Sequence, residues 1–212
     1  RNMSALWMAQ TISQAGDAIY QFALMWLVLD MTNSPAITGL IAMSAYLPAL
    51  VLGLFAGVLS DRMNRFRLMV GAHVCQSMTV IAIPVLIHYD MATGLIIGIV
   101  AFIRSGFSTI FQHAFNAFVP TLFPSKQLLR VNAILVTSGQ IAYILGPALA
   151  GILLAVISLP QLFLIDGLSF LIALGFLTLV VKPNYNPPLI IHSHWKELLD
   201  GFKYLKTNKA LL

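Results

Sequence analysis

Charged residues are scarce in this sequence of 212 residues. Only 9% are Asp, Glu, Lys or Arg, whereas a soluble domain usually carries about 25%. Hydrophobic residues make up 59% of the chain. A water-soluble fold could not cover its surface with so few charges, so we exclude a soluble globular domain and expect lipid to be the main solvent.

Cysteine is nearly absent as well, because Cys75 is the only one. A single thiol cannot form a disulfide within the chain and does not make a cysteine-based metal site. We expect no metal, no cofactor and no enzymatic site. The net charge of +5 does not by itself indicate nucleic acid, because the placement of the basic residues matters more than their sum.

Long apolar segments dominate what is present. A membrane-spanning helix needs about 20 largely apolar residues, and the chain offers six such segments joined by short connections. The sequence therefore predicts an all-α polytopic membrane protein, a six-helix bundle over residues 1–181 in which neighbours along the chain are antiparallel. The expected spans run from Leu6 to Leu29, Ala36 to Ser60, Phe66 to Ile87, Leu95 to Val119, Val131 to Ile157 and Leu162 to Val181.

Residues 182–212 have a different character. The stretch from Pro183 to Pro188 is rich in helix breakers, and the stretch from His194 to Lys209 alternates apolar and charged faces at helical spacing. We predict a cytoplasmic linker with an amphipathic helix that leads to a missing second half. This helix either lies flat on the membrane surface or packs on the protein.

The lysines and arginines are distributed asymmetrically. Eleven of the twelve fall before the first span, in the second and fourth connections, or after the sixth span. The three alternate connections contain none. By the positive-inside rule, both ends of the segment are expected in the cytoplasm. The twelfth basic residue is Arg104, in the middle of the fourth span.

Two spans carry stripes of polar residues at helical spacing. Polar groups at bilayer depth are costly and usually face a bundle interior or a wet cavity, so we predict a substrate cavity shared by these spans. The alternative is a set of interhelical hydrogen bonds that only hold the bundle together. The predicted cavity residues are Gln10, Gln14 and Gln21 from the first span, and Ser108, Phe111, Gln112, His113 and Asn116 from the fourth.

Asp17 and Arg104 are the ionisable members of these stripes. Each lies about halfway along its span, so in antiparallel helices they could meet. A carboxyl group in apolar surroundings holds its proton tightly, whereas a nearby guanidinium favours the charged form. We therefore predict that Asp17 carries a proton and that Arg104 is its partner or an anion contact; a static pair is the competing interpretation. For Asp166, near the outer end of the last span, we expect a structural role.

The connection after the second span contains a specific motif. The segment from Gly57 to Leu68 reads GVLSDRMNRFRL and resembles the cytoplasmic signature of the major facilitator superfamily. Asn64 stands where that family usually has glycine, and asparagine tolerates a left-handed turn better than most residues. The resemblance implies a cytoplasmic gate formed by Gly57, Asp61, Arg62 and Arg65, in which Asp61 would stabilise the N-terminus of the third span.

Two further motifs agree with this resemblance. Arg104 with Gly106 is similar to the family's intramembrane arginine motif, and Gly139, Gly146, Pro147 and Gly151 resemble its antiporter motif. Gly146-Pro147 removes a backbone donor and permits a local bend, whereas Gly53 and Gly57 permit close helix approach. The segments 103–106, 116–120 and 201–202 are similar to the macrolide-efflux and siderophore-export branch.

The resemblance implies the N-terminal half of a twelve-helix fold built from three-helix inverted repeats. Pro48-Ala49-Leu50 in the second span and Pro147-Ala148-Leu149 in the fifth are a weak internal echo of such a repeat. The expected function is efflux of an amphipathic compound, such as a drug or siderophore, in exchange for protons across the bacterial cytoplasmic membrane. The expected partners are lipids, a small-molecule substrate and a second six-helix half of the same polypeptide, and not nucleic acid.

Three alternatives remain open from the sequence. A flippase for lipids or lipid-linked sugars and an uptake symporter would use the same fold. A non-transporting membrane module that dimerises would belong to a different class.

Overall fold

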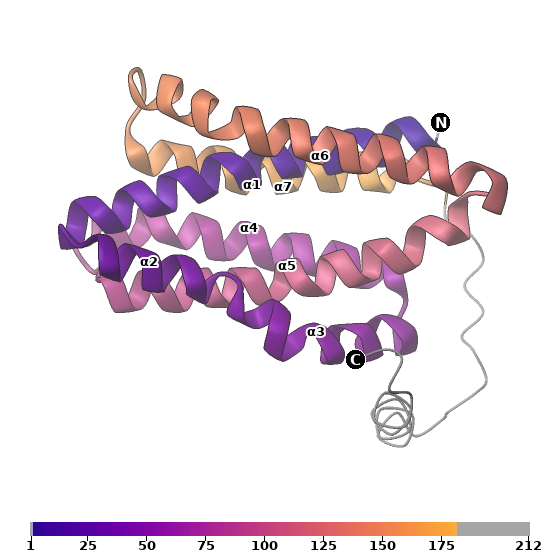
Figure 1. The fold of residues 1–212 in the computed structure, drawn as a ribbon, viewed down its shortest axis with the longest axis horizontal. Helices are drawn as coiled ribbons and strands as arrows, with labels where there is room; N and C mark the ends of the chain where they lie inside the picture. The colour runs from indigo at the N-terminus through magenta and orange to yellow at the C-terminus, as the bar shows by residue number, and fades with distance from the viewer. Residues whose placement is uncertain (1, 182–212) are drawn as a thin grey trace, which may run out of the picture.

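The computed structural model describes residues 2–181, and within this range the chain is helical almost throughout (Figure 1). The predicted linker with its amphipathic helix lies outside the described residues. The helices are α1 (Asn2–Thr32), α2 (Pro35–Ser44), α3 (Leu47–Arg62), α4 (Arg65–His88), α5 (Gly94–Leu122), α6 (Ser125–Leu154) and α7 (Leu159–Thr178).

Short polar residues begin and separate these helices. The Ser34 hydroxyl accepts a hydrogen bond from the Ile37 N–H at the start of α2, and Thr93 does the same for Ile96 at the start of α5. The turns after α1 and α4 contain Asn33 and Asp90, whose φ angles are 48° and 55°. Asparagine and aspartate tolerate this left-handed conformation better than most side chains, so tight turns are possible here without glycine.

The second predicted span is two helices, α2 and α3, rather than one. Pro48 lies in the first turn of α3, where its missing N–H and fixed φ are tolerated. At the break the Ala49 N–H bonds to the Tyr46 carbonyl, so the Ala45 carbonyl is released from the helical pattern. The hydroxyl of Ser105 on α5 donates to that carbonyl.

Most of the described helices can cross a membrane. Five segments are long and apolar enough by length and composition, and one of them, Pro35–Gly53, runs across the break between α2 and α3. Helix α1 is outside this set, although its 31 residues are more than long enough. Its polar stripe lowers its hydropathy, and it packs inside the same bundle. The predicted all-α membrane fold is thus confirmed.

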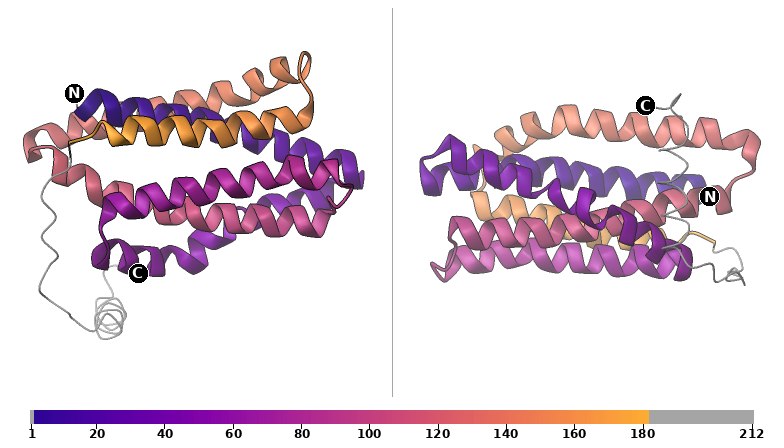
Figure 2. Two further views of the ribbon diagram at one scale, coloured as in Figure 1. Left: turned by 180° about the vertical axis from the view of Figure 1, so that it is seen from behind. Right: turned by 60° about the horizontal axis from the view of Figure 1, so that its bottom comes forward.

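The contacts between helices follow a two-fold pattern. Helix α1 packs against α6 and α7, helix α5 packs against α3 and α4, and α4 meets α7 between the two groups (Figures 1 and 2). Matching the first three spans with the last three pairs α1 with α5, α2–α3 with α6, and α4 with α7. Under this exchange the α1–α7 contact becomes the α5–α4 contact, and the α1–α6 contact becomes the α5–α3 contact. This is the arrangement expected of two inverted three-helix repeats.

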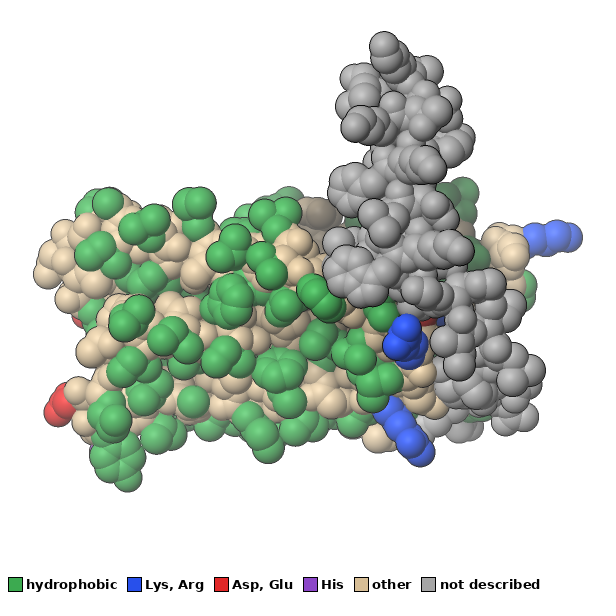
Figure 3. All heavy atoms as spheres, turned by 90° about the horizontal axis from the view of Figure 1, so that it is seen from below, with side chains coloured by type: hydrophobic (Ala, Val, Ile, Leu, Met, Phe, Trp, Pro, Cys, Tyr) green, Lys and Arg blue, Asp and Glu red, His purple; other side chains and the backbone are tan. Residues whose placement is uncertain are grey.

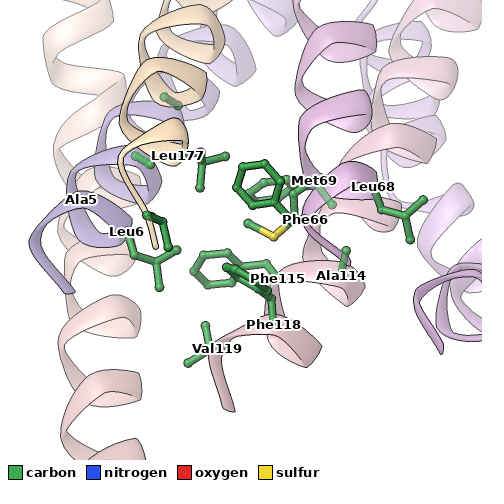
Figure 4. Packing of buried hydrophobic residues seen from close by; sticks show 14 of the residues in the cluster. Ala5, Leu6, Phe66, Leu68, Met69, Ala114, Phe115, Phe118, Val119 and Leu177 are labelled. Atoms are coloured by element: carbon green, nitrogen blue, oxygen red, sulfur yellow. The ribbon is translucent and has the colours of Figure 1, made fainter. Parts of the chain in front are cut away.

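Two apolar clusters fill the interior of the described chain. One surrounds Leu6, Phe66 and Phe118 near the chain's first residues (Figure 4), and the other surrounds Tyr20 and Phe163 toward the opposite end. Along α1 the two clusters are separated by the stretch from Gln10 to Asp17. Buried polar groups are therefore concentrated at mid-height of the bundle, where a membrane is most apolar.

The surface matches this arrangement. Hydrophobic side chains are exposed along the length of the bundle, and the visible lysines and arginines gather toward one end (Figure 3). The antiparallel topology places the α3–α4 and α5–α6 connections, with their basic residues, at that end. Asp30, in the last turn of α1, and Asp90, in the α4–α5 connection, lie at the other end.

Candidate functional site

Arg104 forms the centre of a buried ionic cluster. Its Nη2 donates to Oδ1 of Asp17 on α1 and, over 3.1 Å, to Oδ2 of Asp166 on α7. One nitrogen of one guanidinium thus contacts two carboxylates from two different helices. The Asp166 side chain is 0% exposed and that of Arg104 is 9% exposed, whereas the Asp17 side chain is 37% exposed.

Glycine at position 16 allows α1 and α7 to approach closely beside this cluster. A Cβ at Gly16 would overlap the Ser169 hydroxyl and lie 2.6 Å from Oδ1 of Asp166. A larger side chain would therefore push the two helices apart and separate Asp166 from the guanidinium. The Ser169 hydroxyl itself donates to the Asp166 carbonyl over 2.7 Å and lies 3.5 Å from Oδ1.

Two aromatic rings pack against the guanidinium. The Arg104 Cζ lies 3.7 Å from the ring centroid of Tyr20 and 5.6 Å from that of Phe170. Tyr20 in turn meets the edge of Phe163, with centroids 5.9 Å apart and planes at 74°. Cation–π contacts of this kind stabilise a desolvated guanidinium without adding charge.

A polar cleft lies beside the cluster and reaches Asp17. It consists of three adjoining hollows of about 560, 360 and 340 Å³ that share lining residues. Helices α1, α5 and α6 form its walls, and Tyr46, at the break between α2 and α3, lines the two larger hollows. Asp17 lines both of these larger hollows, so the exposed part of its carboxylate faces the cleft.

The structure brings together most of the residues predicted for a cavity. The polar stripes of α1 and α5 face each other across the cleft, although the Gln10 side chain is largely buried. The Nδ1 of His113 lies 2.9 Å from the Thr109 carbonyl on its own helix. The predicted residues that line the cleft are Gln10, Gln14, Gln21, Ser108, Gln112, His113 and Asn116.

Phe111 does not lie on the cleft lining. Its ring stacks on His73 of α4, with centroids 4.0 Å apart and planes at 19°, and also on Phe115. It belongs to the apolar cluster at the α4–α5 interface. The residue that the structure places at the end of the cleft is Phe115, one helical turn further along.

The predicted gate motif has a different local geometry from the one expected. Asp61 is part of the last turn of α3, and Asn64 caps α4 by accepting a hydrogen bond from the Arg67 N–H over 3.1 Å. Asn64 has φ of −62°, so the expected left-handed turn is absent at this position. Asp61 and Arg62 are exposed, and Arg65 donates to the Ala117 carbonyl on α5 over 2.9 Å.

The glycines of the two motifs differ in how closely they are packed. A Cβ at Gly146 would overlap that of Ala18 on α1, and one at Gly139 would lie 2.8 Å from the Gln14 amide. In contrast, a Cβ at Gly57 or Gly151 would meet no described atom within 4 Å. The close approach expected at Gly53 and Gly57 is therefore absent from the described residues, and the tight glycine contact lies between α6 and α1.

Asp166 lies deeper in its span than the sequence argument placed it, whereas its expected structural role stays a prediction. It is the eighth residue of α7, roughly 10 Å along the axis from the first, and it is fully buried in the ionic cluster. The sequence signal for this position is the i, i+3 spacing of Asp166 and Ser169, which places two polar residues on the same face of a helix. His73 was also missed: it is 1% exposed between Phe111 and Phe170, and no hydrogen bond to its ring nitrogens is found among the described residues.

No metal site accompanies these groups in the described part of the chain, where no cluster of three His, Cys, Asp or Glu side chains could hold an ion. The chemistry available to the cluster is ion pairing and proton exchange. Two carboxylates face one guanidinium; Asp17 and Arg104 line the cleft, whereas Asp166 is not among its lining residues.

Comparison with known proteins adds independent findings. The profile of the transmembrane secretion effector family of the major facilitator superfamily matches residues 2–211. Macrolide efflux protein A of Streptococcus pyogenes is 28% identical over 208 residues, which is 97% of this chain and 51% of that protein.

Two other relatives carry different names. The staphyloferrin A transporter of Staphylococcus aureus is 27% identical over 218 residues, covering 93% of this chain and 52% of the relative. The multidrug efflux pump Tap of Mycolicibacterium fortuitum is 27% identical over 147 residues, covering 66% and 36%. The chain spans about half the length of macrolide efflux protein A.

Proposed function

Because the chain belongs to the transmembrane secretion effector family of the major facilitator superfamily, we propose that it forms the N-terminal half of a proton-coupled exporter. A second six-helix half would complete the transport path, since relatives that match nearly the whole chain are about twice as long. The substrate would be an amphipathic organic compound such as a drug or a siderophore. This agrees with relatives that are named for macrolide efflux and for staphyloferrin A transport.

The observation that carries the proposal is the position of Asp17. Its carboxylate is paired with Arg104 on one side and exposed to the polar cleft on the other. A carboxylate in that position either binds a proton or stays ionised and paired with the guanidinium, depending on how water and the helices are arranged around it. A conformational change that alters the pairing would change its affinity for a proton, which is the requirement for coupling transport to a proton gradient.

The lining of the cleft supports an amphipathic substrate. Amide and hydroxyl groups from α1 and α5 offer hydrogen bonds, and Tyr46, Tyr143 and Phe115 offer apolar surface. Binding sites for organic ligands commonly combine apolar walls with a few polar groups.

We also propose the orientation that the basic residues favour. The end with the α3–α4 and α5–α6 connections would face the cytoplasm of a bacterium, and the end with Asp30 and Asp90 would face outward. A cysteine at Asn33 should then react with a membrane-impermeant maleimide added to intact cells, and a cysteine at Asn64 should not. Labelling of Asn64 from outside would reverse the orientation.

The test of proton coupling is Asp17→Asn in the complete transporter. We expect labelled erythromycin still to bind and still to exchange by counterflow in vesicles without a gradient, whereas uphill efflux driven by an imposed pH gradient stops. The asparagine removes the titrating proton but keeps the size of the side chain. Asp30→Asn, an exposed carboxylate on the same helix, is the matched control and should transport normally.

Normal gradient-driven efflux by Asp17→Asn would remove Asp17 as the carrier. His113 would then be the next candidate, because it lines the same cleft and an imidazole ring can bind and release a proton.

A further inference from the structure

The charges of the buried cluster do not balance. Arg104 contributes one positive charge, and Asp17 and Asp166 contribute two negative charges when both are ionised. An uncompensated charge at bilayer depth is strongly unfavourable unless water reaches it. Water can reach only one of the two carboxylates from the cleft, because Asp17 lines it and Asp166 is fully buried.

The other titratable groups around Asp166 do not correct this imbalance. Helix α1 presents Asp17 and Tyr20, helix α5 presents Arg104, and helix α4 presents His73, whose ring packs against Phe170. In α6 the titratable side chains are Lys126, Arg130 and Tyr143, and all three are exposed. Arg104 is therefore the one cation that the described helices place within ion-pairing distance of either carboxylate.

From this geometry we propose that Asp166 is a permanent counter-ion that holds Arg104 in place and leaves Asp17 as the exchangeable charge of the cleft. The inference rests on the proposed proton coupling and assigns a positioning role to a residue on a third helix. When Asp17 takes up a proton, Arg104 remains paired with Asp166 and no buried guanidinium is left without a partner. When Asp17 releases its proton, the surplus negative charge faces water.

The contacts of the guanidinium fit this division of roles. Arg104 uses one nitrogen, Nη2, for both carboxylates, rather than forming a two-pronged bond to either one. Losing one carboxylate therefore does not require the side chain to move away from the other. Gly16 keeps α7 close enough to α1 for Asp166 to serve the same nitrogen as Asp17.

Folding of the complete transporter provides the first test. Asp17→Asn and Asp166→Asn should each express and remain monodisperse in detergent, because each leaves Arg104 with one carboxylate. The double variant Asp17→Asn/Asp166→Asn leaves the guanidinium without a counter-ion and should express poorly or unfold at a much lower temperature. The double variant Asp17→Asn/Asp30→Asn is the matched control and should behave like Asp17→Asn alone.

Proton uptake provides the second test and needs no substrate. Infrared difference spectra of the purified protein, recorded against pH, should show a protonated-carboxyl band that is absent from Asp17→Asn. In Asp166→Asn the band should remain, but its midpoint should need a proton concentration at least tenfold higher. Arg104 is then paired with Asp17 alone and favours the charged form of that carboxyl group. Asp166→Glu should restore a midpoint close to that of the wild type.

The outcomes separate the two proposals. If Asp17→Asn leaves the carboxyl band unchanged, Asp17 does not exchange the proton, and both the proposed coupling and this inference fail. If the Asp17 band is present but Asp166→Asn does not move it, or if Asp166→Asn alone fails to fold, only the counter-ion role of Asp166 is overturned.

Discussion

The second and fifth spans occupy equivalent places in the two inverted repeats, yet one is broken and the other is not. Each packs against the first helix of the opposite repeat, α3 against α5 and α6 against α1. Each contains the tripeptide Pro-Ala-Leu, at Pro48 and at Pro147. The helix is interrupted just before Pro48, whereas α6 continues through Pro147.

The neighbouring helix accounts for part of this difference. At the break, the Ala45 carbonyl that leaves the helical pattern receives a hydrogen bond from the Ser105 hydroxyl on α5. Opposite Gly146, the residue before Pro147, α1 presents Ala18, which has no side-chain donor. An unpaired carbonyl is costly inside a membrane, so a break is favourable only where such a donor stands opposite.

The residues before the two prolines also differ in position and size. Leu47 is the first residue of α3, directly after the break, whereas Gly146 lies inside the continuous α6. The same glycine is required for packing, because a Cβ there would overlap Ala18. Between α3 and α5 the small residue lies on α5 instead, where a Cβ at Gly106 would come within 3.3 Å of Leu52 on α3. A proline motif thus has no fixed structural meaning apart from its neighbours.

Overfilling the tight contact between Gly146 on α6 and Ala18 on α1 should have the largest effect on stability. Gly146→Leu would force α6 away from Ala18, and overpacking of this kind destabilises by about 3 kcal/mol. Thermal unfolding of the purified transporter, followed by tryptophan fluorescence, should show a clearly lower midpoint. Gly151→Ala lies on the same helix with no described atom near the added Cβ, and it should leave the midpoint unchanged or raise it slightly. Equal losses in both variants would contradict the proposed contact.

Removing the donor at the break should have an intermediate effect. Ser105→Ala leaves the Ala45 carbonyl without its partner, which costs about 1 to 2 kcal/mol. The loss should be smaller in a Pro48→Ala background, because alanine allows the helix to reclaim its own carbonyl groups. A double-mutant cycle on unfolding free energies measures this coupling. Strictly additive effects would show that Ser105 and the break are independent.

Replacing the second proline should change stability least. Pro147→Ala restores an N–H inside a helix that is already continuous. The regained hydrogen bond is offset by the greater freedom of alanine in the unfolded chain, so we expect a net change of less than about 1 kcal/mol. If the flexibility of α6 contributes to transport, erythromycin efflux should slow although the protein is no less stable. Efflux rates at equal expression test this, and unchanged rates would restrict Pro147 to a structural role.

The sequence predicts the parts of this molecule that depend on local periodicity. The polar stripes of the first and fourth spans follow from residues four apart on a helix, and the structure places them on facing sides of one cleft. The meeting of Asp17 and Arg104 follows from their similar depth in antiparallel helices. Phe111 directly precedes Gln112 in the sequence but lies in the α4–α5 interface, where its ring stacks on His73, because helical spacing does not state how wide a cleft is.

Composition and periodicity alone determined that this protein is a helical membrane bundle with polar groups at mid-depth, since charge scarcity and apolar length are properties of the chain. The tertiary structure decided which carboxylates share Arg104 and which proline breaks a helix. Both outcomes depend on atoms from a second helix: the close approach at Gly16 brings Asp166 to the guanidinium, and the Ser105 hydroxyl satisfies the Ala45 carbonyl. The residue pattern of one helix does not indicate which side chains a neighbouring helix will place beside it.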